Sequence, residues 1–326
     1  MAEESFEIQE LNDFITARES GKAKSTIQNY RSALRKFEEF CLKRDIDVTE
    51  IKNREMDTFK GILRGDVSDI TAAQYLGNIS EFYKWLLLDS DKPNPVLELP
   101  QDIDTQNTQH EKPTLDEEEV RDLVNSAQDL RGQALLSLMA TTGLRLKEAC
   151  HAKLSKLDLE ERSLEVMTVK TGFGTRTVYF DRKTRRLLDT YINGGYRLKY
   201  NSQDSDYIFI ASNTNQYKIQ DQEKAEAEGK EIDNANISTD VGRRIFMDAL
   251  KNSSIEVEYE RYSDGRKRSK HTTHILRRSF CQNWIDSHGD IMSLRNTVGW
   301  ESVETAKNYI DDDTDLDKRD RFGITL

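Results

Sequence analysis

The position of proline is the feature that most constrains how this chain folds. All four prolines of the 326 residues lie between Pro93 and Pro113, in a stretch that is also rich in Asp, Asn and Gln. Proline has a fixed φ and no backbone N–H, so such a stretch interrupts helices and stiffens extended chain. We therefore predict two domains, residues 1–92 and 114–326, joined by a linker over residues 93–113.

The first domain is predicted to be a helical bundle. Its clearest apolar stripe lies on a helix predicted to begin after Ser25, a residue type that caps helices. That stripe consists of residues at helical spacing: Ile27, Tyr30, Leu34, Phe37 and Cys41. A second stripe runs from Tyr75 to Leu86, and weaker ones lie at residues 6–15 and 56–63. Four helices in about 90 residues can fold alone, and aromatic residues at these spacings are predicted to be core.

The second domain alternates helical and extended patterns. A capping box at Thr114 and Glu117 predicts a helix start, and residues 130–139 predict a buried helix. Two predicted strands, residues 164–170 and 176–180, flank a turn that contains two glycines. Further helices are predicted at residues 183–191, 238–250, 277–287 and 302–310. The expected fold class is therefore mainly α with a small antiparallel β-sheet.

The net charge of the chain is −11, yet basic residues gather in one segment. Residues 261–278 contain seven Lys or Arg residues and one acidic residue. Such a run is either a solvated loop or a surface for a phosphate backbone, and the sequence leaves both open. The candidate DNA contacts within it are Arg266, Lys267, Arg268, Lys270 and Arg278.

Other classes of protein are disfavoured by composition. No apolar run approaches the length of a membrane span, so we expect a cytoplasmic protein. Cys41, Cys150 and Cys281 are too few and too far apart to indicate a disulfide framework or a CxxC metal site.

Four segments of the second domain carry the residues with chemical potential. In chain order they are TTGLRLKEAC (141–150), VKTGFGTRTVYF (169–180), HTTHILRRSF (271–280) and VGWESVETAKNYI (298–310). Each is weak alone, but together they resemble the catalytic boxes of tyrosine recombinases, the integrase family. The H-x-L-R box is matched by His274 to Arg277, and Trp300 precedes Tyr309 by nine residues, as in the family. The resemblance, which covers residue 5 to Tyr309, implies a two-domain clamp on DNA: a SAM-like helical core-binding domain and a catalytic domain.

Two arginines in these boxes suit attack on a phosphodiester. That attack builds negative charge on the non-bridging oxygens, and a guanidinium offers a planar, permanently charged fork to two of them. The resemblance assigns this role to Arg145 and Arg277. For either arginine taken alone, a structural ion pair is the preferred interpretation. Glu148 follows Arg145 by three residues, and we expect it to lie on the same helical face and hold the guanidinium.

The resemblance makes Tyr309 the nucleophile, which would leave a phosphotyrosine at the DNA 3′ end and a free 5′ hydroxyl. A phenol has a pKa of about 10 and needs a proton acceptor at neutral pH. His274 lies one helical turn before Arg277 and is the preferred acceptor, with His271 as the rival.

The departing 5′ oxygen needs a proton, which the family takes from a lysine on the strand turn. Lys170 matches that position, although the turn to Arg176 is one residue longer than in many members. Arg176 is a candidate phosphate contact. Trp300 stands where His is more common in the family. Its indole N–H can donate to a phosphate oxygen but cannot shuttle a proton, so we assign it a hydrogen-bonding and packing role. A plain core tryptophan is an equally good interpretation of this residue.

The predicted function is a site-specific DNA recombinase that cuts and rejoins DNA through a 3′-phosphotyrosine, with no cofactor, metal or ATP. The family implies double-stranded DNA and self-association to a tetramer on paired sites as partners, with accessory DNA-bending or directionality proteins as further ones. Two alternatives stay open: a catalytically inactive DNA-binding protein of the same fold, and a type IB topoisomerase that relaxes supercoils.

Overall fold

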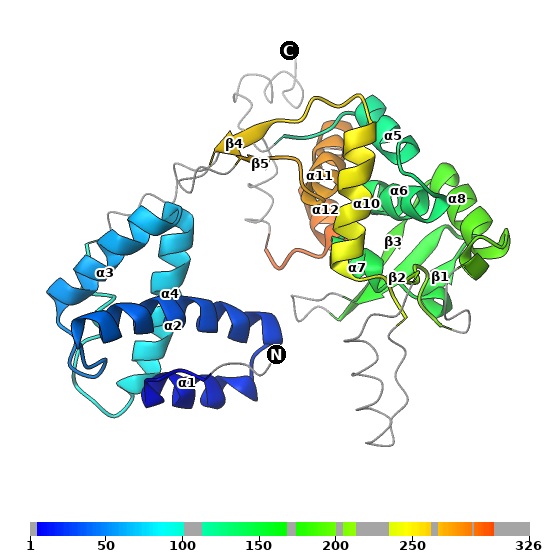
Figure 1. Ribbon diagram of the computed structural model, residues 1–326. Coiled ribbons are helices and arrows are strands. Elements are labelled where there is room, and N and C mark those ends of the chain that lie inside the picture. The colour runs from blue at the N-terminus through cyan, green and yellow to red at the C-terminus, as the bar shows by residue number, and fades with distance from the viewer. Residues whose placement is uncertain are drawn as a thin grey trace, which may run out of the picture. The chain divides into compact units, whose positions relative to one another are not determined.

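The computed structural model describes residues 5–100, 113–167, 174–199, 205–212, 235–261, 267–288 and 290–302. The chain divides into two compact units (Figure 1), one of Met1–Glu111 with Tyr259–Arg268, the other of Lys112–Glu258 with Ser269–Leu326. Both are built mainly from helices. The described residues also form a three-stranded antiparallel sheet in the second unit and a two-stranded sheet from Tyr259–Arg261 and Lys267–Ser269, which confirms the predicted fold class. Within the described parts, no helix combines the length and apolarity that a membrane crossing requires.

The described residues of the first unit form four helices, as the apolar stripes predict. They are α1 (Gln9–Glu19), α2 (Lys24–Arg44), α3 (Asn53–Asp66) and α4 (Asp69–Leu86). The predicted cap at Ser25 is wrong, because α2 begins one residue before it and Ala23 takes the N-cap position. Ser68 does cap α4, since its hydroxyl accepts a hydrogen bond from the Thr71 N–H.

Aromatic side chains form the core of the first unit. Phe14 packs edge-on against Tyr30 and Phe82, with ring centroids 5.2 and 5.6 Å apart. The buried Tyr83 hydroxyl donates to the Val48 carbonyl at 2.9 Å, so its polar end is satisfied. These rings are core residues, as expected. Val96 and Leu99, from the proline-rich stretch, are buried in the same cluster.

The second unit is built around α6. Most of its side chains are buried because helices α5, α8, α10 and α11 pack against it (Figure 1), which explains the continuous apolar run in its sequence. The elements from here on are α5 (Glu117–Asn125), α6 (Leu130–Thr142), α7 (Leu146–Cys150), η1 (Leu154–Lys156), β1 (Leu157–Asp158), β2 (Ser163–Met167), β3 (Thr175–Tyr179), α8 (Arg182–Asn193), η2 (Arg197–Lys199), α10 (Thr239–Asn252), β4 (Tyr259–Arg261), β5 (Lys267–Ser269), α11 (His274–His288) and α12 (Ile291–Val298).

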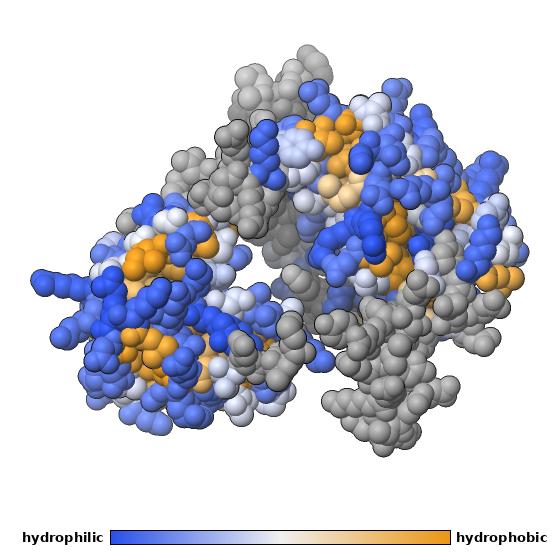
Figure 2. All heavy atoms as spheres, in the orientation of Figure 1, coloured by the Kyte–Doolittle hydropathy of each residue, from blue (hydrophilic) through white to orange (hydrophobic). Residues whose placement is uncertain are grey.

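The sheet of the second unit has the antiparallel order β1-β2-β3. Leu164 pairs with Val178, and both side chains are fully buried against the helices. Alternate residues of these strands face outward. Figure 2 shows mainly hydrophilic side chains on the visible face of each unit, with small apolar areas between them.

The start of α5 differs from the prediction. Asp116, not Thr114, is the N-cap: its carboxylate accepts from the Glu119 N–H at 2.8 Å, and the Glu119 carboxylate accepts from the Asp116 N–H at 3.0 Å. Both residue types cap helices well. The choice of Asp116 places three glutamates in the first turn, where the helix dipole favours negative charge.

Candidate active site

The turn between α6 and α7 is the centre of the site. Gly143 ends α6 with φ of 64°, in the left-handed region that favours glycine. A Cβ atom at this position would lie 2.6 Å from Cδ1 of Phe280, so packing also requires glycine. The tight turn lets α11 approach, and Arg277 Nη1 donates to the Gly143 carbonyl at 2.7 Å.

Arg145 lies at the N-cap of α7, immediately before the helix. Its backbone N–H donates to Glu148 Oε2 at 2.9 Å, and its Nη1 lies 3.4 Å from Glu148 Oε1. The prediction that both residues share a helical face is wrong in detail, because Arg145 precedes the first helical residue. The two side chains still meet across the first turn. The Arg145 side chain is 24% exposed, and it can therefore reach a ligand.

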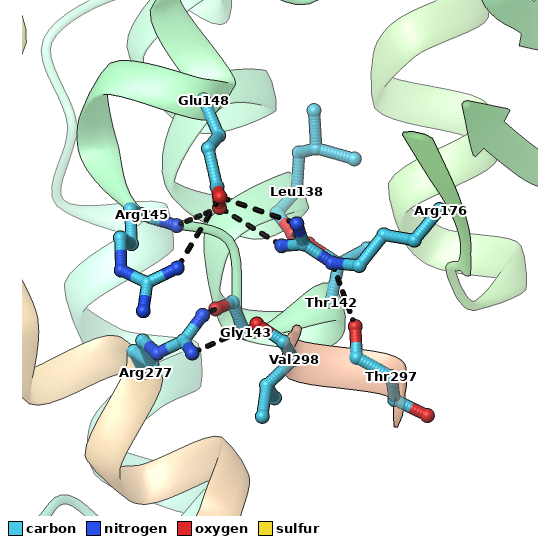
Figure 3. Close-up of polar contacts among 9 residues, drawn as sticks. All are labelled: Leu138, Thr142, Gly143, Arg145, Glu148, Arg176, Arg277, Thr297 and Val298. Atoms are coloured by element: carbon cyan, nitrogen blue, oxygen red, sulfur yellow. Dashed lines mark hydrogen bonds and ion pairs between the residues drawn. The ribbon is translucent and has the colours of Figure 1, made fainter. Parts of the chain in front are cut away.

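Arg176 on β3 is the second partner of Glu148. Its Nη1 and Nη2 donate to the two carboxylate oxygens at 3.2 and 2.9 Å, and its Nε donates to the Thr297 carbonyl at 3.0 Å (Figure 3). Sequence reasoning missed this pair, because it matched Glu148 with Arg145 alone.

Glu148 is ionised in this setting. Burial alone would raise the pKa of its carboxyl, but the hydrogen bonds and charge of Arg176, together with the Arg145 N–H and guanidinium, hold that pKa below its usual range. One buried carboxylate therefore anchors two guanidinium groups.

Arg277 on α11 is fully buried. Besides the Gly143 carbonyl, it donates from Nη2 to the Val298 carbonyl at 2.9 Å, and its Cζ lies 5.9 Å from the ring centroid of Trp300. The two carbonyls fix the plane of the guanidinium, and the indole supports it through a cation–π contact.

The C-terminus of α12 completes the cluster. Gly299 ends this helix with φ of 67°, and the Trp300 N–H donates to the Arg295 carbonyl at 3.0 Å. A Cβ on Gly299 would meet Arg176 Nη1 at 3.1 Å, so this glycine allows the guanidinium to approach. Trp300 is 2% exposed and packs with Cys281, which agrees with the core interpretation.

The two histidines of the third box differ in environment. His274 is the first residue of α11 and is exposed. His271 is buried, and its Nδ1 has no hydrogen-bond partner among the described residues. Burial lowers the pKa of the His271 imidazole, although the carboxylates of Glu258 and Glu119 act in the opposite direction.

Several predicted site residues are not placed by the structure. Lys170, Tyr309 and Arg266 lie outside the described residues. In β5, Lys267 is exposed, and Arg268 is described only in its backbone. Their assigned roles stay predictions.

The other candidate DNA contacts have partners within the protein. Lys270 Nζ lies 2.8 Å from Glu258 Oε2, and Arg278 Nη1 donates to the Pro113 carbonyl at 3.0 Å. Arg176, also a candidate phosphate contact, is only 9% exposed in its side chain. A DNA-contact role of these residues stays a prediction.

Sequence profiles of two families match this chain. The profile described as "Phage integrase family" matches residues 113–315, more than half of the chain. The chain belongs to the phage integrase family. The "Phage integrase, N-terminal SAM-like domain" matches residues 8–91. The family predicted from the four boxes is thus confirmed, and with it the prediction of a tyrosine recombinase.

Curated relatives of this integrase family member match it in sequence over most of their length. It is 23% identical over 299 residues to "Tyrosine recombinase XerC" of Leptospira interrogans serogroup Icterohaemorrhagiae serovar copenhageni, with 90% of this chain and 84% of the relative covered. The protein of the same name from Bacillus pumilus is 26% identical over 305 residues, covering 87% and 85%.

Solved structures show the same fold at low sequence identity. The Tn1549 transposon integrase in complex with transposon right-end DNA matches with a TM-score of 0.70 at 15% identity, over 96% of this chain and 98% of that one. A lambda integrase tetramer bound to a Holliday junction matches with a TM-score of 0.65 at 15% identity, over 93% and 77%.

Proposed function

We propose that this integrase family member is a site-specific DNA recombinase that cuts and rejoins strands through a 3′-phosphotyrosine at Tyr309, without metal or ATP. The observation that carries the proposal is that one turn, between α6 and α7, positions both Arg145 and Arg277. Arg277 is bonded to the carbonyl of Gly143, two residues before Arg145, so the α6–α7 turn presents both guanidinium groups together (Figure 3).

Two fixed guanidiniums are what phosphoryl transfer demands. Catalysis of this reaction is mostly positioning and electrostatic stabilisation of the phosphoryl oxygens. Donors that are fixed before the substrate binds need no reorganisation during the reaction. Arg145 is held by Glu148, and Arg277 by two backbone carbonyls.

The proton transfers are assigned to His274 and Lys170. His274 is exposed one turn before Arg277, which suits a group that accepts the phenol proton of Tyr309. Lys170 is proposed to protonate the departing 5′ oxygen. Trp300 packs beneath the Arg277 guanidinium, which supports a packing role.

The proposed substrate is double-stranded DNA, and the protein is proposed to assemble as a tetramer on paired sites. Residues 1–92 would form the core-binding domain, 93–113 the linker and 114–326 the catalytic domain. The family profiles over residues 8–91 and 113–315 support this division. The DNA complexes among the similar structures support the substrate. Affinity is expected to fall steeply as salt rises, because phosphate contacts release counterions.

A suicide substrate tests the nucleophile. A nicked duplex whose cleavage releases a short fragment traps the covalent adduct, seen as a shifted protein band. We expect the adduct with the wild type in the presence of EDTA, and none with Tyr309→Phe, which should bind the same DNA equally well. An adduct with the Phe variant would assign the nucleophile to another residue, and loss of the adduct in EDTA would contradict a metal-free reaction.

Two further readouts separate the alternatives. A wild type that binds DNA but forms no adduct would favour the inactive DNA-binding protein. Relaxation of plasmid that lacks paired sites would favour topoisomerase-like activity. For Lys170→Ala, a 5′-bridging phosphorothiolate should restore cleavage, because its sulfur leaves without a proton donor, and failure of that rescue would remove Lys170 as the acid.

A further inference from the structure

Arg176 joins three elements of the second unit. Its guanidinium donates to both carboxylate oxygens of Glu148 on α7. Its Nε donates to the carbonyl of Thr297 near the end of α12. Arg176 itself is carried by β3, where Val166 of β2 is its register partner. One side chain thus links the sheet to the two helices that flank the arginine cluster (Figure 3).

The contacts of Arg176 are those of an interior ion pair. Its side chain is 9% exposed and that of Glu148 is fully buried. The pair has a planar fork facing a carboxylate, the arrangement in which Arg differs most from Lys. Gly299 lies against the same guanidinium, and a Cβ added there would lie 3.1 Å from Arg176 Nη1, closer than ordinary van der Waals contact. The Nε and both Nη atoms of Arg176 donate to acceptors within the protein, and this complete set of contacts favours a fixed internal role over contact with a phosphate from outside.

The geometry of Arg145 depends on this pair. Glu148 contacts the Arg145 guanidinium from Oε1 at 3.4 Å and the Arg145 N–H from Oε2 at 2.9 Å, and Arg176 binds the same two oxygens. Without Arg176, the carboxylate would lose its bidentate partner and one of the two cations that offset its burial, and it would be freer to rotate. A displaced carboxylate would displace Arg145 in turn.

We infer that Arg176 is a positioning residue for DNA cleavage: it fixes Glu148, and through it the guanidinium of Arg145, and it does not itself contact the DNA. The inference rests on the proposed function. It replaces the expectation of a phosphate contact with a role inside the protein. A shift of about 1 Å in a catalytic group can lower a rate about 100-fold, so indirect action through Glu148 is sufficient for a large effect.

The first experiment compares Arg176→Gln with Arg186→Gln, a matched loss of an arginine on the exposed surface of α8. Single-turnover cleavage of the suicide substrate is measured at saturating DNA, and affinity is measured over a range of salt. For Arg176→Gln we expect the cleavage rate to fall about 10- to 100-fold. Affinity and the slope of log affinity against log salt should match those of the wild type and of Arg186→Gln.

A phosphate contact would give a different result. Each lost contact lowers the salt slope by about 0.9, with weaker binding throughout. A reduced slope for Arg176→Gln would overturn the inference, and so would an unchanged cleavage rate.

The second experiment separates positioning from general damage. A methylphosphonate at the scissile position replaces one charged oxygen by a methyl group, so cleavage depends less on guanidinium charge. We expect the defect of Arg176→Gln to shrink at least about tenfold on this substrate relative to phosphate DNA. An equal defect on both substrates would mean a merely structural role and would contradict the inference.

If Arg176→Gln does not fold, Arg176→Lys replaces it, because lysine keeps the charge beside Glu148 but lacks the planar fork. The loss of cleavage rate relative to wild type is then measured for this variant on phosphate DNA and on methylphosphonate DNA. A wild type that forms no adduct on phosphate DNA would contradict the proposed function, and the inference with it. A wild type that cleaves, with an Arg176 variant that cleaves as fast, would contradict the inference alone.

Discussion

Arg277 donates a 2.7 Å hydrogen bond to the carbonyl of Gly143, a residue 134 positions earlier in the chain. This bond ties the third catalytic box to the first. It exists because Gly143 ends α6 in a left-handed conformation and leaves room for α11. The placement of the two arginines that we propose to be catalytic is therefore a consequence of helix ends and not of long flexible loops.

Replacing Gly143 by Ala should destabilise the protein by about 2 to 4 kcal/mol, since backbone strain adds to overpacking against Phe280. Gly174 is the matched control, because it has the same φ of 64° and a Cβ added there would meet no atom within 4 Å. Gly174→Ala should cost only about 1 kcal/mol. Urea denaturation measures both, and equal losses would show that the contact with Phe280 carries no cost.

Replacing Glu148 by Gln should cost about 3 kcal/mol at neutral pH, because it leaves the buried Arg176 without its counter-ion. The pKa of Glu148 is lowered on folding, so its ionised form stabilises the protein above the ordinary value of 4.5 and this contribution is lost as the pH falls through the folded pKa. The difference between wild type and variant should therefore shrink in acid below about pH 4.5.

Unfolding titrations at several pH values measure this difference, with the exposed Glu161→Gln as control. A loss from Glu148→Gln that stays constant down to pH 3, about 1.5 units below the ordinary value, would contradict the ion-pair account.

Substitutions of His274 and His271 should have different effects on the cleavage rate. His274→Gln removes the proposed proton acceptor and should slow cleavage about 100- to 1000-fold with little change in stability. His271→Gln should leave the rate nearly unchanged, because the His271 side chain is buried in the protein, whereas His274 is exposed to a substrate. Single-turnover cleavage measures both, and a larger rate loss for His271→Gln would exchange their roles.

His271 should also affect stability as the pH changes. Its pKa is lowered on folding, so the unfolded chain takes up a proton first as the pH falls below the ordinary value of 6.5, and stability is lost in that window. His271→Gln should flatten the dependence of unfolding free energy on pH just below 6.5. An unchanged slope of unfolding free energy against pH would show that the pKa of His271 is the same in the folded and unfolded states.

Trp300 should act through its ring and not through its N–H. Trp300→Phe keeps an aromatic face near Arg277 and should preserve cleavage within about threefold. Trp300→Ala should cost about 3 to 5 kcal/mol in stability, because it empties a buried site. A large rate loss in a stably folded Trp300→Phe would instead indicate that the indole N–H donates to the phosphate.

Periodicity predicted the helices well where a long stripe faces one core. The stripe from Ile27 to Cys41 lies on α2, and the apolar run from Leu130 lies on α6. Helix starts were less predictable, because Thr114 and Asp116 are both capable caps and only tertiary packing selects one. At α2 the N-cap is Ala23, which makes no side-chain capping hydrogen bond, so no capping residue marks the start of this helix in the sequence.

The arginine cluster around Glu148 was predictable in its residue types but not in its pairings. Arg145 and Glu148 are neighbours in sequence, so their contact could be foreseen. The pair of Arg176 with Glu148 spans 28 residues and depends on where β3 lies beside α7, which local pattern does not encode. A usable signal was present in Gly143 and Gly299, since a glycine directly after a helix marks a left-handed helix end. In this structure another element lies close to each of these two ends.

The identity of the nucleophile is the central claim, and peptide mapping of the trapped adduct tests it most directly. The wild-type protein is trapped on a suicide substrate, digested with nuclease and protease, and analysed by mass spectrometry for the peptide that carries a nucleotide. We predict a 3′-nucleotide attached through phosphate to the phenol oxygen of Tyr309. A nucleotide on any other residue, or a trapped complex without a phosphotyrosine, would contradict this assignment.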